Sequence, residues 1–93
     1  MTIQQIEYFL LVAELNSFSK AAERAYVSQP AISKQITLLE KEMEMTLFDR
    51  RYRKATLTPP GKLIYEMLTR HRTEYNITCN EAKRLFSQWK NAV

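Results

Sequence analysis

Residues 28–37, SQPAISKQIT, contain several short side chains that can donate or accept hydrogen bonds. Read at helical spacing, Gln29, Ser33, Lys34 and Thr37 share one face, opposite a stripe of apolar residues. A helix face that meets only water more often carries Glu and Lys pairs, whereas this face is small, polar and barely charged. Short donors and acceptors of this kind fit against base edges in the major groove of DNA. The pattern therefore predicts a helix that reads base pairs.

A basic cluster follows this stretch. Residues 1–46 carry four basic and six acidic side chains, whereas residues 47–62 carry a single acid, Asp49, and five basic side chains: Arg50, Arg51, Arg53, Lys54 and Lys62. A local positive field attracts a polyanion such as nucleic acid. The alternative is a surface loop that is basic only because it is solvated.

The remaining reactive side chains give no basis for catalysis or metal binding. The chain has one His, one Cys and no Gly-rich loop, so it lacks the paired acids, or the nucleophile and base, that an enzyme needs. His71 lies in an apolar repeat, where packing is a simpler role than metal ligation, and Cys79 is more simply an inert thiol than a redox switch. A single cysteine also excludes an internal disulfide. We expect no enzyme activity, no metal and no cofactor.

Composition indicates what kind of molecule positions these residues. The chain has 93 residues, 45% of them apolar, with one Gly and three Pro, which describes one small folded domain. No export signal is apparent, and the longest apolar run, Tyr8–Ala13, is far shorter than the roughly 20 residues that span a bilayer. We therefore expect a cytoplasmic protein with no membrane partner.

Two helices are expected before the polar stretch. Thr2 and Gln5 have the spacing of a capping box, and one helical face then carries apolar residues up to about residue 15, namely Ile3, Ile6, Leu10 and Ala13. Asn16 tolerates the left-handed conformation that ends helices. Ser17 or Ser19 can then cap a short second helix over residues 20–25.

A third helix is expected to begin at the polar stretch itself. Ser28 is suited to cap it, and Pro30 is tolerated in its first turn. Its core-facing stripe consists of Ile32, Ile36, Leu39 and Met43. We expect Val27 to point inward just before it, and we expect four aromatic residues to belong to the core: Phe9, Phe18, Tyr26 and Phe48.

A hairpin and a long helix are expected after the third helix. Two β-prone segments, near residues 47–49 and 55–57, flank the basic turn. Thr58 can cap a fourth helix whose first turn accommodates two prolines, and no helix breaker follows before Val93. At about 1.5 Å per residue this helix would be about 50 Å long, which is more than a domain of this size needs for its own core.

The fourth helix carries a repeat with the spacing of a seam between helices. Alternating steps of four and three residues give Ile64, Leu68, His71, Tyr75, Thr78, Ala82, Leu85 and Trp89. Three of these eight are His, Thr and Ala, so the seam is impure. We favour a dimerising helix, and the alternative is a helix that packs on a further portion of the same chain.

The motifs SFSKAAERAYVSQPAISKQI and LFDRRYRKATLTPPG resemble the N-terminal DNA-binding domain of LysR-type transcriptional regulators, over nearly two-thirds of the chain. The resemblance implies a mainly α fold, with a winged helix-turn-helix over residues 1–58 and a linker helix over residues 59–93. In that family the linker helix pairs antiparallel with that of a second copy, and the full-length protein can form a tetramer. The implied function is sequence-specific binding of double-stranded DNA as a homodimer, in bacterial transcription regulation.

The chain departs from the family pattern at three positions. Glu44 stands where the family usually has Gly, Pro60 where it has Ala or a similar helix former, and Asn16 where Gly is common. Glu44 must then bear some backbone strain or extend the third helix slightly. Family members also continue into a ligand-sensing domain of two α/β lobes. The resemblance therefore predicts that these residues are a fragment, which holds no effector site and binds no small molecule. The alternative is a natural stand-alone regulator.

Helix-turn-helix geometry assigns a role to each polar residue of the third helix, because the first residues of a recognition helix face the base edges. Gln29 and Ser33 are expected to read bases, while Pro30 offers an apolar surface to a thymine methyl group. Phosphate contacts are expected from Ser28, Lys34 and Thr37. Ser28 has a joint role, since its capping function needs no DNA at all.

The wing is expected to meet the minor groove. Arg53, at its tip, is the best candidate to enter the narrow and negatively charged groove. Arg50 and Arg51 either bind DNA beside it or simply keep the wing soluble. A second function remains open, namely a protein-interaction module that uses the long helix and the basic wing. Steep weakening of binding by salt would distinguish DNA from such a partner.

Overall fold

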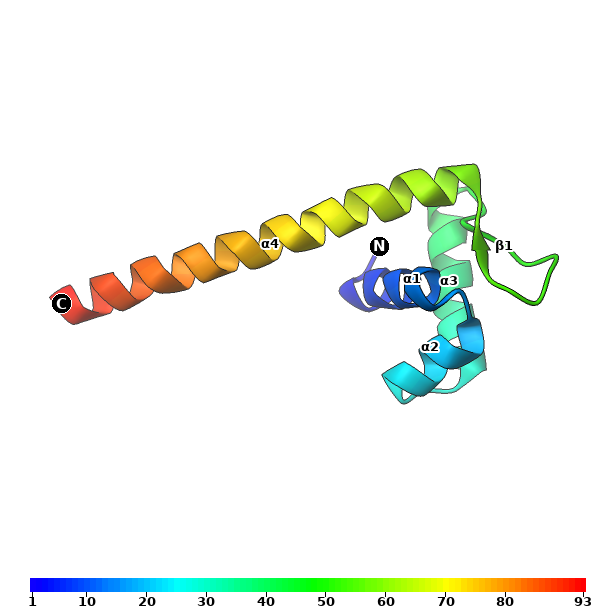
Figure 1. The fold of residues 1–93 in the computed structure, drawn as a ribbon, viewed down its shortest axis with the longest axis horizontal. Coiled ribbons are helices and arrows are strands. Elements are labelled where there is room, and N and C mark those ends of the chain that lie inside the picture. Colours follow the sequence, from blue (N-terminus) through cyan, green and yellow to red (C-terminus); the bar gives the residue numbers. More distant parts are fainter.

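The computed structural model describes all 93 residues and contains four helices and one two-stranded hairpin (Figure 1). Its elements in chain order are α1 (Ile3–Leu15), α2 (Phe18–Ala25), α3 (Gln29–Met43), β1 (Phe48–Asp49), β2 (Thr56–Leu57) and α4 (Pro59–Ala92). The first three helices form a compact head, and the hairpin projects from it as a wing. The predicted mainly α fold, with a winged helix-turn-helix and a long C-terminal helix, is confirmed.

Each helix begins at a Ser or Thr whose hydroxyl accepts a hydrogen bond from a first-turn amide. The caps are Thr2, Ser17, Ser28 and Thr58, with oxygen to nitrogen distances between 3.0 and 3.2 Å. At Thr2 the predicted capping box is complete, because the Gln5 side chain also accepts from the Thr2 amide. Of the two serines predicted to cap α2, Ser17 is the one that does. These caps satisfy amides that have no partner inside the helix.

The first three helices all end in a non-glycine residue with left-handed backbone geometry. Asn16 has φ 54°, as expected, and Glu44 has φ 56°, so Glu44 bears the strain that its family position implied. Tyr26 has φ 59°. The prediction that Tyr26 belongs to the core was wrong, since its side chain is 95% exposed. A left-handed residue at the end of α2 turns the chain sharply, and here the Tyr26 side chain lies outside the packed faces of the helices.

The core lies where α1, α3 and the base of the wing meet. Its largest fully buried side chains include Phe9, Ile32, Ile36 and Leu39. Phe48 packs against two aromatic rings at its centre, those of Phe9 at 5.3 Å and Phe18 at 5.5 Å between ring centroids. Met43 and Val27 are half-buried at its edge. The predicted stripe of α3 therefore does face the core.

The predicted apolar face of α1 is only partly correct. Leu10 is buried, but Ile3 is 77% exposed, and Gln5, Phe9 and Val12 complete the buried side instead. Gln5 can be buried because its amide is satisfied twice, by the Thr2 amide at 3.0 Å and by Gln35 at 3.3 Å. The inward face of α1 is therefore rotated relative to the one that hydrophobicity alone suggested.

The wing and the start of α4 are joined closely. Phe48 pairs with Leu57 and Asp49 with Thr56 in an antiparallel register. The Thr58 amide donates to the Leu47 carbonyl at 3.0 Å. Gly61 lies in the first turn of α4 directly against that carbonyl, so a Cβ atom at Gly61 would be 2.2 Å from the oxygen. Only glycine allows this approach.

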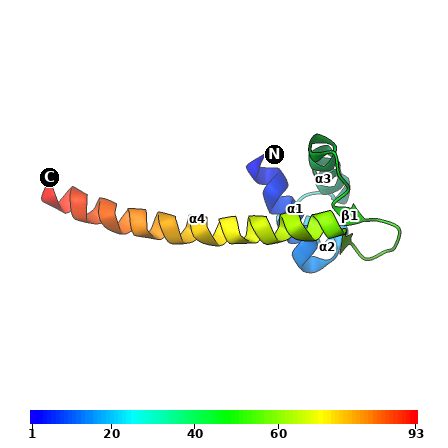
Figure 2. The same cartoon turned by 90° about the horizontal axis from the view of Figure 1, so that it is seen from above.

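Helix α4 has two parts with different surroundings. Its N-terminal part packs on the head through Leu68, which is 4% exposed, and Arg72 pairs with Glu14 of α1 at 2.9 Å. The remainder projects far beyond the head, as both views of the ribbon show (Figures 1 and 2), and gives the molecule extents of 58 by 27 by 21 Å. None of the helices combines the length and the apolar character needed to cross a membrane.

Candidate nucleic-acid interface

The outer face of α3 presents a group of polar side chains that are free to bind. Gln29, Lys34 and Thr37 are exposed, and Ser33 is half-buried beside them. None of these four side chains makes a hydrogen bond or ion pair within the chain, so their donors and acceptors are all available. Pro30 is exposed in the first turn of the same face. The structure thus brings the predicted base-reading and phosphate-binding residues of α3 together.

The N-terminus of α3 adds a favourable electrostatic element to this face. Ser28 uses its hydroxyl oxygen to accept from the Ala31 amide at 3.2 Å, which confirms its capping role. No acidic residue lies in the first turn, so nothing offsets the positive end of the helix dipole. Helix N-termini of this kind attract phosphate groups.

Helix α2 supports α3 in the arrangement of a helix-turn-helix. Ala21 and Ala22 are both buried on α2, and their small side chains allow the two helices to approach closely. The connection between the helices consists of Tyr26, Val27 and Ser28 alone. The first residues of α3, Gln29, Pro30 and Ala31, are exposed at the surface, and Figure 1 shows the short connection from α2 to α3.

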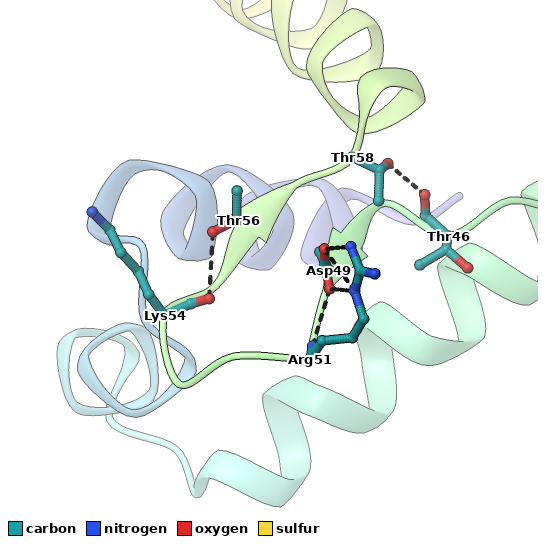
Figure 3. A network of polar contacts seen from close by, with 6 residues as sticks. All are labelled: Thr46, Asp49, Arg51, Lys54, Thr56 and Thr58. Carbon is teal, nitrogen blue, oxygen red and sulfur yellow. Dashed lines mark hydrogen bonds and ion pairs between the residues drawn. The ribbon is translucent and has the colours of Figure 1, made fainter.

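Two of the predicted wing arginines have partners within the chain. The Arg51 guanidinium donates hydrogen bonds to both carboxylate oxygens of Asp49 (Figure 3). Its Nε lies 3.0 and 3.2 Å from the two oxygens, and a terminal nitrogen lies 2.7 Å from Oδ2. This contact lowers the pKa of Asp49 from its ordinary 3.8 to about 2, and Asp49 in turn raises the pKa of Arg51. Arg50 donates to Glu40 of α3 at 2.8 Å. Neither guanidinium is fully available to an external ligand.

Two other basic side chains of the wing are free. Arg53 and Lys54 are exposed, and their charged groups make no ion pair or hydrogen bond within the chain. Figure 3 shows the Lys54 amine directed away from the pair of Asp49 and Arg51. Our sequence prediction included Arg53 but omitted Lys54 from the site, although Lys54 belongs to the same basic cluster. Its charge and turn position were the signal that could have identified it.

The residues of the predicted seam fall into three groups along α4. Ile64 and Leu68 pack in the core of this same chain, which accounts for their apolar character without any partner. His71, Tyr75 and Thr78 line a groove of about 1150 Å³ between α4 and α1. The last group, Ala82, Leu85 and Trp89, is exposed on the projecting part of α4.

The groove between α1 and α4 has an apolar floor. Ile3, Ile6 and Leu10 line it from α1, which explains why the apolar residues of α1 do not all face the core. Cys79 also lines the groove, next to Tyr75 in the helix, and it raises the pKa of the Tyr75 phenol. The structure contains no cluster of three or more His, Cys, Asp or Glu side chains that could hold a metal ion.

Comparison with solved structures finds this architecture in complexes with DNA. The DNA-binding domain of BenM, in complex with benA site 1 DNA, superposes with a TM-score of 0.87 and 32% sequence identity, covering 91% of this chain and 99% of that one. The DNA-binding domain of CbnR in complex with DNA superposes with a TM-score of 0.81 and 31% identity, covering 89% of this chain and 95% of that one.

Comparison of sequences identifies relatives of the same kind. A probable RuBisCO transcriptional regulator of Cyanidioschyzon merolae is 38% identical over 84 residues, which are 90% of this chain and 28% of that protein. Another of the same name, from Porphyra purpurea, is 40% identical over 90 residues, which are 97% of this chain and 27% of that protein. The chain therefore spans little more than a quarter of the length of these relatives.

The family model for bacterial regulatory helix-turn-helix proteins of the lysR family matches residues 3–62, from the start of α1 to the first turn of α4. The matched region contains α3 and the entire wing, and the relatives are named as transcriptional regulators. These matches confirm the prediction of a regulatory domain rather than an enzyme. This chain belongs to the lysR family of bacterial regulatory helix-turn-helix proteins.

Proposed function

We propose that this chain binds double-stranded DNA in a sequence-specific way and serves transcription regulation as a homodimer. Residues 1–58 would form the winged unit that reads DNA, and residues 59–93 the linker helix that joins two copies. The single observation that carries this proposal is the outer face of α3, where four polar side chains have no partner within the chain beside an uncompensated helix N-terminus. A face of this kind suits a polar ligand, and duplex DNA fits its shape.

Base reading falls to the first two turns of α3. Gln29 has an amide that can pair bidentately with adenine, and the hydroxyl of Ser33 can serve as donor or acceptor to either base. Pro30, between them on the surface, suits an apolar contact with a thymine methyl group. Ser28, Lys34 and Thr37 would hold phosphates on either side, and such contacts fix the register of a helix in the groove.

The wing supplies contacts outside the major groove. Arg53 has a free guanidinium on an exposed loop, and such a group is drawn to the negative potential of a narrow A·T-rich minor groove. Lys54 adds a second unpaired charge nearby. Arg51 can contribute when a phosphate displaces Asp49, and Arg50 contributes to the positive field.

Dimerisation through α4 follows from its exposed apolar side chains. Leu85 and Trp89 of the seam, and Phe86 beside them, are all more than half exposed on the part of the helix that projects beyond the head. Most helical stability in proteins comes from packing of an apolar face, so the projecting part of α4 needs a surface to pack on. A second copy of this chain offers a matching surface, because the seam spacing on α4 is that of helices that pair with one another.

Selection from a random duplex library tests this function. We expect the chain to enrich one motif whose affinity falls linearly with salt on logarithmic axes, because bound phosphates release counterions. Gln29→Ala should keep the fold and the salt dependence, yet lose about 1–3 kcal/mol of discrimination at one base pair of each half-site. Gln88→Ala, on the exposed end of α4, is the matched control and should change neither property.

Two outcomes would contradict the proposal. If no duplex is enriched and binding does not respond to salt, the exposed helix and basic wing serve a protein partner. If Gln29→Ala retains the full sequence preference, other residues of α3 read the bases.

A further inference from the structure

The Glu40 side chain, in the C-terminal half of α3, is directed at the wing and not at solvent. Its side chain is only 10% exposed. One carboxylate oxygen, Oε2, accepts from the backbone amides of Leu47 at 2.6 Å and Phe48 at 3.2 Å. The other, Oε1, accepts from the Arg50 guanidinium at 2.8 Å. Three donors from the first wing strand and its flanks therefore converge on one carboxylate of the recognition helix.

Arg50 joins this carboxylate to a third element. Its guanidinium carbon lies 5.1 Å from the centroid of the Phe18 ring, in the first turn of α2. The guanidinium thus contacts α3 through Glu40 and α2 through Phe18 at the same time. A cation over an aromatic ring is attracted by the negative face of the ring, and Arg makes such contacts more often than Lys.

The two strands of the wing are fixed to the head by different means. The second strand is held to the head by a backbone hydrogen bond from the Ala55 amide to the Asn16 carbonyl at 3.1 Å, and the Thr58 amide ties its far end to Leu47, just before the first strand, at 3.0 Å. The two strands themselves form only two residue pairs, and a hairpin this short does not hold its own geometry. Glu40 is the group of α3 that accepts from the amides at the start of the first strand.

We infer that Glu40 and Arg50 are positioning residues that set the angle of the wing to the recognition helix. Through this contact Arg53 and Lys54 reach the same duplex that Gln29 reads, and Arg50 itself touches no phosphate. This inference rests on the proposed function, since it concerns how the wing and α3 act on one DNA molecule. It gives Arg50 a different role from the DNA contact expected from the sequence.

The negative charge of Glu40 is essential to this role. A carboxylate accepts hydrogen bonds at both oxygens, and bonds to a charged acceptor are about twice as strong as those between neutral groups. In Glu40→Gln one oxygen becomes an amino group, which faces either the two backbone amides or the Arg50 guanidinium. The NH₂ group of the glutamine then faces another hydrogen-bond donor instead of accepting from it, and the wing loses part of its attachment to α3.

The first measurement needs no DNA. Amide hydrogen exchange should accelerate by about tenfold or more at Leu47 and Phe48 in Glu40→Gln, since a charge-assisted bond is lost, while the amides of α1 keep their protection. Glu44→Gln is the matched control, because Glu44 is a nearby exposed glutamate that makes no hydrogen bond through its side chain. Equal exchange in both variants would show that Glu40 does not fix the wing.

The second measurement uses the duplex enriched by the unsubstituted chain, with A·T-rich flanks. Glu40→Gln should weaken binding about tenfold, a loss typical of one charge-assisted contact, and Arg53→Ala combined with Lys54→Ala should weaken it at least as much. Adding Glu40→Gln to that double wing variant should weaken binding no further, because the wing contacts are already gone. Glu40→Gln combined with Gln29→Ala should show additive losses, because those residues act on different parts of the duplex. Additive losses when Glu40→Gln is combined with the double wing variant Arg53→Ala, Lys54→Ala would overturn the positioning role.

Arg50 is tested in the background of Arg53→Ala combined with Lys54→Ala, where Arg50→Leu should leave the salt slope unchanged. A further fall of the slope by about one would mean that Arg50 neutralises a phosphate itself. If Glu40→Gln fails to fold, Arg50→Leu replaces it in the additivity test, since leucine keeps a side chain against Phe18 and leaves the two amide bonds of Glu40 in place. Failure of the unsubstituted chain to bind any duplex would contradict the proposed function, and with it this role, whereas the exchange result still reports on the wing alone.

Discussion

Tyr26 has an unfavourable backbone conformation with no packing to compensate it. Its φ is 59° and its side chain is 95% exposed. Left-handed geometry costs a residue with a Cβ roughly 1–2 kcal/mol, and Asn tolerates it better than other such residues. We expect Tyr26→Asn to raise the melting temperature by several degrees. Tyr52→Asn is the control, since Tyr52 is an exposed tyrosine without positive φ, and it should not raise the melting temperature. A lower melting temperature for Tyr26→Asn would mean that the tyrosine ring contributes to stability.

Asp49 should titrate far below an ordinary aspartate. Arg51 lowers its pKa from 3.8 to about 2, so the stabilising contact is present above the unfolded pKa and is lost as the pH falls through about 2. NMR titration of the carboxyl carbon should show this value directly. In Arg51→Ala the pKa should return toward 3.8, whereas Arg53→Ala should leave it unchanged because Arg53 does not contact Asp49. An Asp49 pKa near 3.8 in the unsubstituted chain would show that the pair is open in solution.

Single residues were predictable where their partner lies within about four positions in the chain. Ser28 as a cap and Gln5 in a capping box depend only on local spacing, and both were confirmed. Glu40 was missed because its partners lie seven to ten residues away, across a turn whose geometry no local pattern reveals. Tyr26 was misjudged because aromatic character was taken as a sign of burial, although the end of a helix imposes its own geometry.

At the scale of the elements, α4 and the wing meet at a contact that only Gly61 permits. Ala in an exposed helix usually stabilises by up to about 1 kcal/mol relative to Gly. Here Gly61→Ala should instead destabilise, by about 1–3 kcal/mol, because its methyl group would overlap the Leu47 carbonyl oxygen. Chemical denaturation of this variant and of Lys62→Ala, an exposed neighbour in the same turn, should separate the two effects. Equal denaturation midpoints for Gly61→Ala and the unsubstituted chain would mean that α4 can move away from the Leu47 carbonyl without loss of stability.

The sequence predicted the boundaries of the elements closely, but it did not predict correctly which face of α1 lies inward. The four caps and the apolar stripe of α3 are repeated local signals, so they predicted helices within a few residues. For α1 the apolar residues serve two surfaces at once, the core and the groove beside α4. A hydrophobic pattern does not distinguish these surfaces, and a buried Gln5 adds a polar residue to the inward face. Only the packing of α4 across α1 shows which apolar residues of α1 face the core and which line the groove.

At the scale of the whole molecule, the repeat along α4 has two physical origins. Leu68 belongs to the intrachain core and would be apolar in a monomer. Leu85 and Trp89 have no such contact, so their apolar character needs a different explanation. The seam predicted from sequence included both sets of residues, because a periodic pattern does not show whether an apolar face packs on the same chain or on another. A test of dimerisation must therefore leave Leu68 intact, since an acid there would disrupt the core itself.

The projecting half of α4 provides that test. We expect Leu85→Asp combined with Trp89→Asp to convert a dimer into a monomer, because unpaired carboxylates are not tolerated in a helix interface. Sedimentation equilibrium should then give half the mass, while the thermal transition of the head persists. Ile77→Asp is the matched control, since Ile77 is 65% exposed on the same helix but lies outside the seam, and it should remain dimeric. The monomeric variant should also bind a two-half-site duplex far more weakly than the dimer, because linked sites gain from a raised effective concentration. An unchanged mass, or equal disruption by Ile77→Asp, would show that the seam on α4 is not the surface that joins two copies.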